Sequence, residues 1–166
     1  MVIGLFPGYD SAERAIAAVT SRGYAGSDIS AVIDDDVSQR YIGSRAAKES
    51  ALAGTTTGGL DLGGPSGGAL GTLFTAVTAV GTFLLVPGLV IAGPLAQALT
   101  AAGAAAITGG LIGAVHDWGI PNEQVEKYEA AIKAGSILLG VKPRTEDDAQ
   151  VIERQWKALG AERLER

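Results

Sequence analysis

The chain has no cysteine among its 166 residues. This absence excludes a disulfide framework, a thiol nucleophile and a cysteine-based metal site. Histidine occurs once, at His116, and a single histidine cannot supply a dedicated zinc site within one chain. Bases are also scarce, since 13 Lys and Arg stand against 18 Asp and Glu and the net charge is -5. Without a basic surface, we expect no nucleic-acid partner.

Charge is missing altogether from one long segment. From Leu62 to Val115, 54 residues, there is no Asp, Glu, Lys, Arg or His. We name residues 62–115 the uncharged segment. Much of it is glycine, and the whole chain has 24 glycines, about twice the usual share. Such a segment enters a bilayer, forms the core of an assembly, or packs within its own chain.

The glycine-rich stretch GGPSGGALGT lacks the pattern of a nucleotide site. A P-loop needs a lysine to neutralise phosphate, and no lysine lies between Lys48 and Lys127. A dinucleotide fingerprint also fails, because no GxGxxG follows a predicted strand. We therefore expect no nucleotide cofactor and assign these glycines to helix packing.

The N-terminal end has the pattern of a strand, a helix and a second strand. Residues 2–6 form a short apolar run that ends at the turn pair Pro7-Gly8. Asp10 is predicted to cap the following helix, with Glu13 in the capping-box position. Gly23 is placed to end that helix. The next run alternates as a half-buried strand does, with its apolar side formed by Ile29, Ala31 and Ile33.

The C-terminal end repeats this scheme. Residues 137–141 form a strand candidate, which ends before Pro143. Thr145 is predicted to cap a helix, with Asp148 in the box position, and Gly160 to end it. The closing ERLER suits a short edge strand. The buried stripe of this helix is predicted to be Ala149, Ile152, Trp156 and Leu159.

Two matching halves predict an α+β, ferredoxin-like βαββαβ sandwich, in which helices cover a four-stranded antiparallel sheet. Two unrelated βαβ pieces are the alternative. Residues 1–36 form the first half, residues 37–120 an insert, and residues 121–166 an amphipathic helix plus the second half. That helix is predicted to start at Pro121, with Val125, Tyr128 and Ile132 on one face.

Within the insert, residues 37–50 are polar and suit a helix, and two apolar helices are expected at about 66–86 and 94–116. They would form a hairpin through the turn PGLVIAGP. Small residues recur every four positions in both, a glycine-zipper spacing that lets helix backbones approach closely. The packing positions are Gly67, Gly71, Thr75 and Ala79 in the first helix, and Ala101, Ala105, Gly109 and Gly113 in the second.

The outer faces of this predicted hairpin need a partner. We favour copies of the same chain over lipid, because Ala and Gly are weakly apolar and no Lys or Arg flanks the segment closely. Cover of the chain's own sheet is the third possibility. The start MVIGLFPGYD lacks a basic region and reaches Asp10 too soon for a signal peptide. A cytoplasmic location is expected, with association to the cytoplasmic membrane as the alternative.

Two groups of residues are weak candidates for a metal site. Asp34, Asp35 and Asp36 follow a predicted strand and could hold a cation, although a solvated loop explains them more simply. His116 and Asp117 could bind metal only where copies meet at a symmetry axis. The alternatives are a helix C-terminal cap and a polar anchor where the apolar hairpin meets water. No catalytic constellation is found, so we expect a non-enzymatic protein without metal or cofactor.

Three stretches together resemble bacterial general-stress and low-temperature-induced protein domains. They are LFPGYDSAERAIAAVTSRGYAGSDISAVI, the glycine-rich apolar insert, and GIPNEQVEKYEAAIKAGSILLGV, which cover nearly the whole chain. The resemblance implies a ferredoxin-like domain split by a glycine-rich helical hairpin and a link to stress physiology, with no catalytic residues. The leading hypothesis is a stress-associated protein that self-assembles through the hairpin. A membrane-associated hairpin and a small-ligand sensor are the alternatives.

Overall fold

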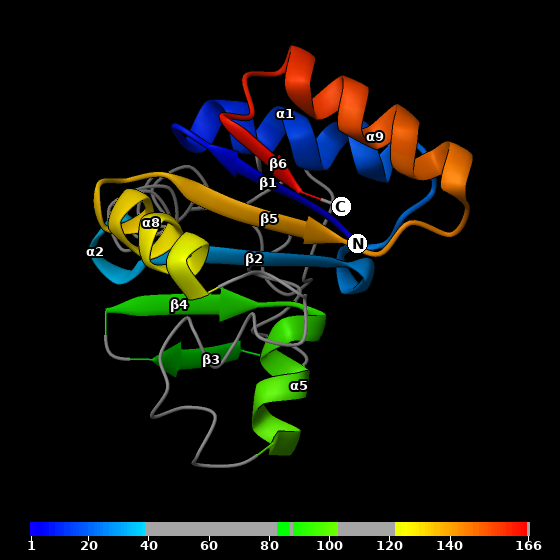
Figure 1. Cartoon of the computed structure of the whole chain (residues 1–166). Helices are drawn as coiled ribbons and strands as arrows, with labels where there is room; N and C mark the ends of the chain where they lie inside the picture. The colour runs from blue at the N-terminus through cyan, green and yellow to red at the C-terminus, as the bar shows by residue number, and fades with distance from the viewer. Residues whose placement is uncertain (39–82, 87, 103–121, 166) are drawn as a thin grey trace, which may run out of the picture.

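The computed structural model describes residues 1–38, 83–86, 88–102 and 122–165, which form an α+β molecule (Figure 1). Their six strands make one antiparallel sheet in the order β3-β4-β2-β5-β1-β6. The strands are β1 (Val2–Phe6), β2 (Ile29–Asp34), β3 (Phe83–Val86), β4 (Leu89–Ala92), β5 (Ile137–Val141) and β6 (Arg163–Glu165). The helices are α1 (Tyr9–Thr20), α2 (Asp35–Ser38), α5 (Pro94–Ala102), α8 (Asn122–Lys133) and α9 (Glu146–Ala158), with a 3-10 turn at Gly26–Asp28.

The two ends of the chain form the elements that the sequence predicts. The first contributes β1, α1 and β2, and the second contributes β5, α9 and β6, with β5 between β1 and β2. Gly23 and Gly160 follow α1 and α9 with φ of 84° and 90°, conformations that favour glycine. The Thr145 hydroxyl accepts a hydrogen bond from the Asp148 N–H at 3.1 Å, so the predicted cap of α9 is confirmed.

The first core lies between one face of the sheet and the pair α1 and α9, which run side by side (Figure 1). Trp156 of α9 is fully buried there. Its indole N–H donates to the Ala15 carbonyl at 3.2 Å, and its ring meets Phe6 edge-on with centroids 5.5 Å apart. Ala149 and Ile152 are buried beside it, and Leu159 is partly buried, which confirms the predicted stripe.

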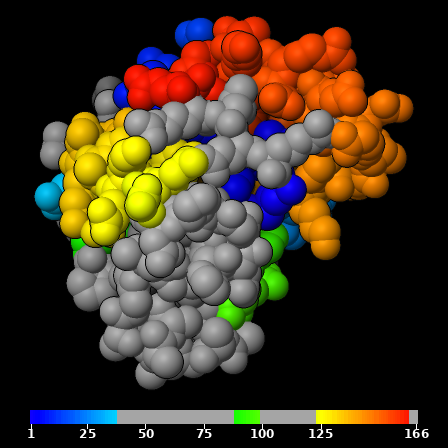
Figure 2. Space-filling model, viewed as in Figure 1, coloured from blue at the N-terminus to red at the C-terminus, as the bar shows by residue number. Residues whose placement is uncertain are grey.

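The second core covers the opposite face of the sheet. Val125, Tyr128 and Ile132 of α8 are fully buried against it, as the amphipathic pattern predicts. Leu95 and Ala96 of α5 belong to the same core, so part of the uncharged segment packs within its own chain. Figure 2 shows the outer side of α8 in yellow. Because helices lie on both faces, β2 is buried on both sides rather than half-buried.

Ser30 explains why a polar residue interrupts the otherwise apolar β2. It is only 4% exposed. Its hydroxyl accepts a hydrogen bond from the Leu95 N–H at 3.2 Å, at the start of α5. A buried hydroxyl with such a partner satisfies an N–H that the first turn of a helix cannot bond internally. Ser30 therefore interrupts the apolar run because it caps α5, and not because that side of β2 faces solvent.

The predicted cap of α1 is wrong. The helix begins at Tyr9, its N-cap is Gly8, and no side chain caps it. Gly8 is extended, with φ of -175°, and the chain enters the helix directly after the Pro7-Gly8 turn. Asp10 therefore lies inside the first turn, where its negative charge still interacts favourably with the helix dipole. The Ser11 hydroxyl donates to the Gly8 carbonyl at 2.8 Å.

The predicted helix over residues 66–86 is wrong at its C-terminal end, because Phe83–Val86 forms strand β3. The stretch PGLVIAGP, expected only to join two helices, contains strand β4, which pairs with β3 in a β-hairpin and with β2 on its other side. Short apolar runs fit a strand and a buried helix equally well, so periodicity does not separate them. The sheet has six strands instead of four for this reason. The rest of that predicted helix lies outside the described residues.

The predicted start of the second apolar helix is confirmed, since α5 begins at Pro94. Its expected continuation over 103–116 lies outside the described residues. The polar stretch 37–50 is described only at its start, where α2 ends at Ser38.

Candidate functional site

The described part of the uncharged segment lies at one outer end of the sheet. It comprises β3, β4 and α5, and α5 contacts both strands and β2 (Figure 1). Of the predicted helix-packing positions, Ala101 lies in α5. The others lie outside the described residues: Gly67, Gly71, Thr75, Ala79, Ala105, Gly109 and Gly113.

Gly93 makes the connection from β4 to α5 possible. Its φ is 82°, in the left-handed region. A Cβ atom at this position would overlap the Ile29 carbonyl oxygen and lie 3.1 Å from the Ser30 Cα. Both obstacles are backbone atoms of the central strand β2, which cannot rotate away. Only glycine therefore lets the chain leave the hairpin and start α5 so close to β2.

The acidic triplet spans the end of β2 and the start of α2, and its first member, Asp34, caps α2. Asp34 Oδ1 accepts hydrogen bonds from the N–H groups of Asp36 at 3.0 Å and Val37 at 3.3 Å. The Asp35 N–H donates to the Gly88 carbonyl at 3.2 Å, which ties this loop to the β3–β4 turn. Among the described residues, no three acidic or histidine side chains lie where they could share a metal ion. His116 and Asp117 lie outside the described residues.

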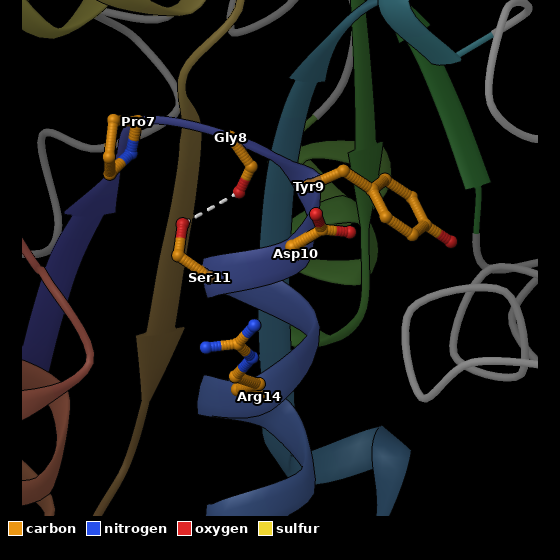
Figure 3. A pocket seen from close by; sticks show the side chains of 6 residues that line it. All are labelled: Pro7, Gly8, Tyr9, Asp10, Ser11 and Arg14. Carbon is orange, nitrogen blue, oxygen red and sulfur yellow. Dashed lines mark hydrogen bonds between the residues drawn. The ribbon is translucent and has the colours of Figure 1, made fainter.

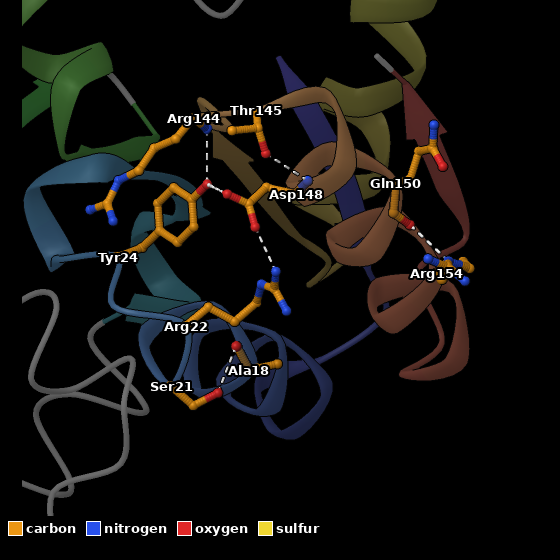
Figure 4. Close-up of polar contacts among 9 residues, drawn as sticks. All are labelled: Ala18, Ser21, Arg22, Tyr24, Arg144, Thr145, Asp148, Gln150 and Arg154. Atoms are coloured by element: carbon orange, nitrogen blue, oxygen red, sulfur yellow. Dashed lines mark hydrogen bonds and ion pairs between the residues drawn. The ribbon is translucent and has the colours of Figure 1, made fainter.

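A polar cluster joins the two ends of the chain, and Figure 4 shows all of its residues except Asp28. It consists of Arg22, Tyr24 and Asp28 from the loop before β2, with Arg144 and Asp148 from the start of α9. Arg22 Nη2 donates to Asp148 Oδ1 at 2.5 Å, and the Tyr24 hydroxyl donates to Asp148 Oδ2 at 3.1 Å. The Tyr24 hydroxyl also accepts from the Arg144 N–H at 2.9 Å.

Arg144 completes the polar cluster from above the Tyr24 ring. Its guanidinium carbon lies 4.5 Å from the ring centroid, within the range of a cation–π contact. The same guanidinium donates to the Gly23 carbonyl at 2.9 Å and lies 3.5 Å from Asp28 Oδ2. The charged groups of the cluster thus pair with one another, and the cluster holds the α1–β2 loop against the start of α9.

The pKa of the Asp148 carboxyl is held below its ordinary value of 3.8. The hydrogen bond from Arg22 is the largest cause, and the bond from the Tyr24 hydroxyl and the charge of Arg22 add to it, while partial burial opposes them. When folding lowers the pKa of a carboxyl, the ionised carboxylate stabilises the folded state. This stabilisation is complete at pH values above the pKa that the group has in the unfolded chain. This contribution disappears as the pH falls through the lower, folded pKa.

The variant Asp148→Asn is therefore expected to be less stable than the wild type at neutral pH. The difference should shrink in acid, well below pH 3.8, because the wild-type carboxylate then becomes protonated too. Urea-unfolding midpoints at the two pH values measure this. Asp147→Asn is the matched control, because Asp147 is exposed in the same helical turn. A stability difference that is equal at both pH values would contradict the assigned role of the Asp148 charge.

A surface hollow of about 390 Å³ lies at the start of α1 (Figure 3). Its lining combines the carboxylate of Asp10 and the guanidinium of Arg14, both on exposed residues, with the Ser11 hydroxyl. The Tyr9 ring points away from the other labelled side chains and is buried. Because Asp10 and Arg14 carry opposite charges on the same open rim, the hollow favours neither an anionic nor a cationic ligand.

A smaller cavity of about 200 Å³ lies beside the start of α5. Its lining is mostly apolar, from Met1, Pro94 and Leu95, and it also includes Asp28 and Lys142. This volume lies below the roughly 300–1,000 Å³ of usual ligand pockets, so the cavity does not support the ligand-sensor hypothesis.

The polar cluster is the feature that the sequence reasoning missed. Tyr24 and Arg144 each lie in a loop without a recognisable motif, so no local pattern predicts their contact. The two matching halves do contain a signal for this contact. They predict one sheet, and in it β2 and β5 are antiparallel neighbours. The loop before β2 and the loop after β5 therefore reach the same end of the sheet, where their charges meet.

Within the described ranges, no helix combines the length and the apolar character that crossing a membrane requires. Comparison of the chain with protein-family models, with curated proteins and with solved structures finds no match.

Proposed function

We propose that the chain is a non-enzymatic, stress-associated protein that assembles with copies of itself through the uncharged segment, residues 62–115. In this proposal β1, α1, β2, β5, α9 and β6 form a ferredoxin-like scaffold. The order β2-β5-β1-β6 within the sheet, with α1 after β1 and α9 after β5, supports that scaffold. The link to stress rests on the resemblance of the chain to general-stress domains.

The observation that carries the proposal is the position of the described part of the uncharged segment. β3, β4 and α5 form one end of the sheet, and β3 is an outermost strand among the described residues. β4 contributes residues to the cores on both faces of the sheet, and α5 contributes Leu95 and Ala96 to the second core. Among the described residues, the segment thus ends the sheet with an uncharged outermost strand, and such an edge is suited to contact another molecule.

Light scattering coupled to size-exclusion chromatography, on protein released from cells without detergent, tests the proposal. A discrete species heavier than the 16.8 kDa chain supports assembly. Protein that stays in the membrane pellet after an alkaline wash, and dissolves only in detergent, would instead support a membrane-associated segment. A monomer at all concentrations would refute self-assembly.

The glycine spacing yields a prediction with a matched control. Gly71→Leu and Gly109→Leu are expected to break the assembly, because a large side chain at a close-packing position separates the backbones. Gly110→Leu introduces the same side chain one position off the predicted stripe and should leave the assembly intact. Particle mass by light scattering measures the effect, with far-UV circular dichroism as a check that the scaffold stays folded. Unchanged particle mass in both stripe variants would count against the glycine positions.

A further inference from the structure

The two outer strands of the described sheet differ in how they limit association with other strands. β6 at one edge has three residues, of which Arg163 and Glu165 are charged. Short length and charge are the usual means by which an edge strand avoids pairing with other chains. β3 at the other edge has four residues, FLLV, and no charge. Its partner β4, LVIA, has none either.

The backbone of β3 carries hydrogen-bonding groups on both sides. In an antiparallel ladder, successive residues direct their N–H and C=O groups alternately towards and away from the neighbouring strand. β4 pairs with all four residues of β3 but occupies only one side of the strand. Among the described elements, β3 lies against β4 and α5, and no strand lies beyond it (Figure 1). Half of the backbone groups of β3 therefore point to the outer side.

We propose that the outer edge of β3 pairs antiparallel with β3 of a second copy of the chain, which joins two sheets edge to edge. This inference rests on the proposed self-assembly and specifies its contact. An antiparallel pair of identical strands is self-complementary about a two-fold axis, so each copy supplies the donors that the other needs. The uncharged sequence from Phe83 to Ala102 brings no like charges together at this axis. An identical apolar strand is thus the occupant that fits the edge.

The two-fold axis makes the contact easy to test. It stands perpendicular to the joined sheet and places one residue opposite its own copy. For a four-residue strand that pairs along most of its length, this residue is Leu84 or Leu85. The two Cα atoms of such a pair lie roughly 4.5–5.5 Å apart, which is within the range of a disulfide. The neighbouring residue meets its own copy only on the diagonal, at roughly 7–8 Å, which is too far.

Single-cysteine variants of the full chain use this geometry, because the wild type has no cysteine that could interfere. Leu84→Cys, Leu85→Cys and, at the other edge, Leu164→Cys are oxidised mildly and separated on a non-reducing gel. We expect a covalent dimer in one of the two β3 variants and none in Leu164→Cys. In the wild type, hydrogen exchange of a peptide covering β3 should slow as the protein concentration rises.

The outcomes separate this inference from the proposed function. A wild-type assembly in which neither β3 variant cross-links, and in which exchange in β3 does not depend on concentration, overturns the edge contact alone. A wild type that stays monomeric and shows the same two results overturns both. Protection of the whole of β3 in a wild type that light scattering shows to be monomeric would mean that the chain covers its own edge, which also overturns the contact.

Discussion

The variant Gly93→Ala is expected to lower the free energy of unfolding by roughly 2–6 kcal/mol, the sum of left-handed strain and overpacking. Two causes act together at this position. The φ of 82° lies in a region that alanine rarely adopts. In addition, the new Cβ would overlap the Ile29 carbonyl oxygen, so either β2 or the connection to α5 must shift. Because β2 pairs with both β4 and β5, such a shift would disturb the centre of the sheet.

Gly88→Ala separates these two causes. Gly88 has nearly the same φ, 80°, but a Cβ there would meet nothing within 4 Å. Only the left-handed strain applies, so the expected loss is about 1–2 kcal/mol. Urea denaturation of both variants, followed by far-UV circular dichroism, gives the comparison. Equal losses in the two variants would show that the close approach of Gly93 to β2 is not as described.

The variant Trp156→Ala is expected to lose about 3–5 kcal/mol of stability, the usual effect of truncating a large buried aromatic residue. The side chain of Trp156 in α9 is fully buried against α1 and β1. Its ring lies against Phe6 and against the backbone at Gly4, where even an added Cβ would lie 2.8 Å from a ring atom. This tight contact leaves the surrounding residues little freedom to fill the cavity that alanine would create.

Trp156→Phe and Lys157→Ala are the controls for this prediction. Phenylalanine keeps most of the apolar contact but loses the hydrogen bond to the Ala15 carbonyl, so about 1–2 kcal/mol should be lost from that bond and from the smaller ring. Lys157 is exposed one residue further along α9, and its truncation should change stability by less than about 0.5 kcal/mol. If Trp156→Ala unfolded at nearly the same urea concentration as Lys157→Ala, the position of Trp156 in the first core would be wrong.

Most of the scaffold could be predicted from the sequence, because its signals are local. Turn residues such as Gly160 and the cap Thr145 act within a few residues of their position, and both hold in the structure. The apolar stripes of α8 and α9 likewise predict their buried faces. The predicted Asp10 cap is wrong because the helix begins two residues earlier, with Gly8 as its N-cap. Both positions are compatible with a helix start, and residue type alone does not decide between them.

The candidate site could be predicted only in part. The sequence singles out the uncharged segment through composition, but it does not distinguish strand from helix at FLLV and LVIA. The pairing of β4 with β2 decides this, and the two are separated by more than fifty residues of chain. The polar cluster has the same origin, because Arg22 and Asp148 are 126 positions apart.

The sequence by itself determined the elements at both ends of the chain, the helix stripes and the absence of charge over 54 residues, because these depend on local spacing and composition. Only the tertiary structure decided that β3 and β4 extend the sheet, that α5 and α8 cover its second face, and that Gly93 must be glycine. These features depend on which distant backbones lie side by side. Hydrogen-bond pairing and close packing between remote segments set that arrangement, and no local pattern of residues encodes it.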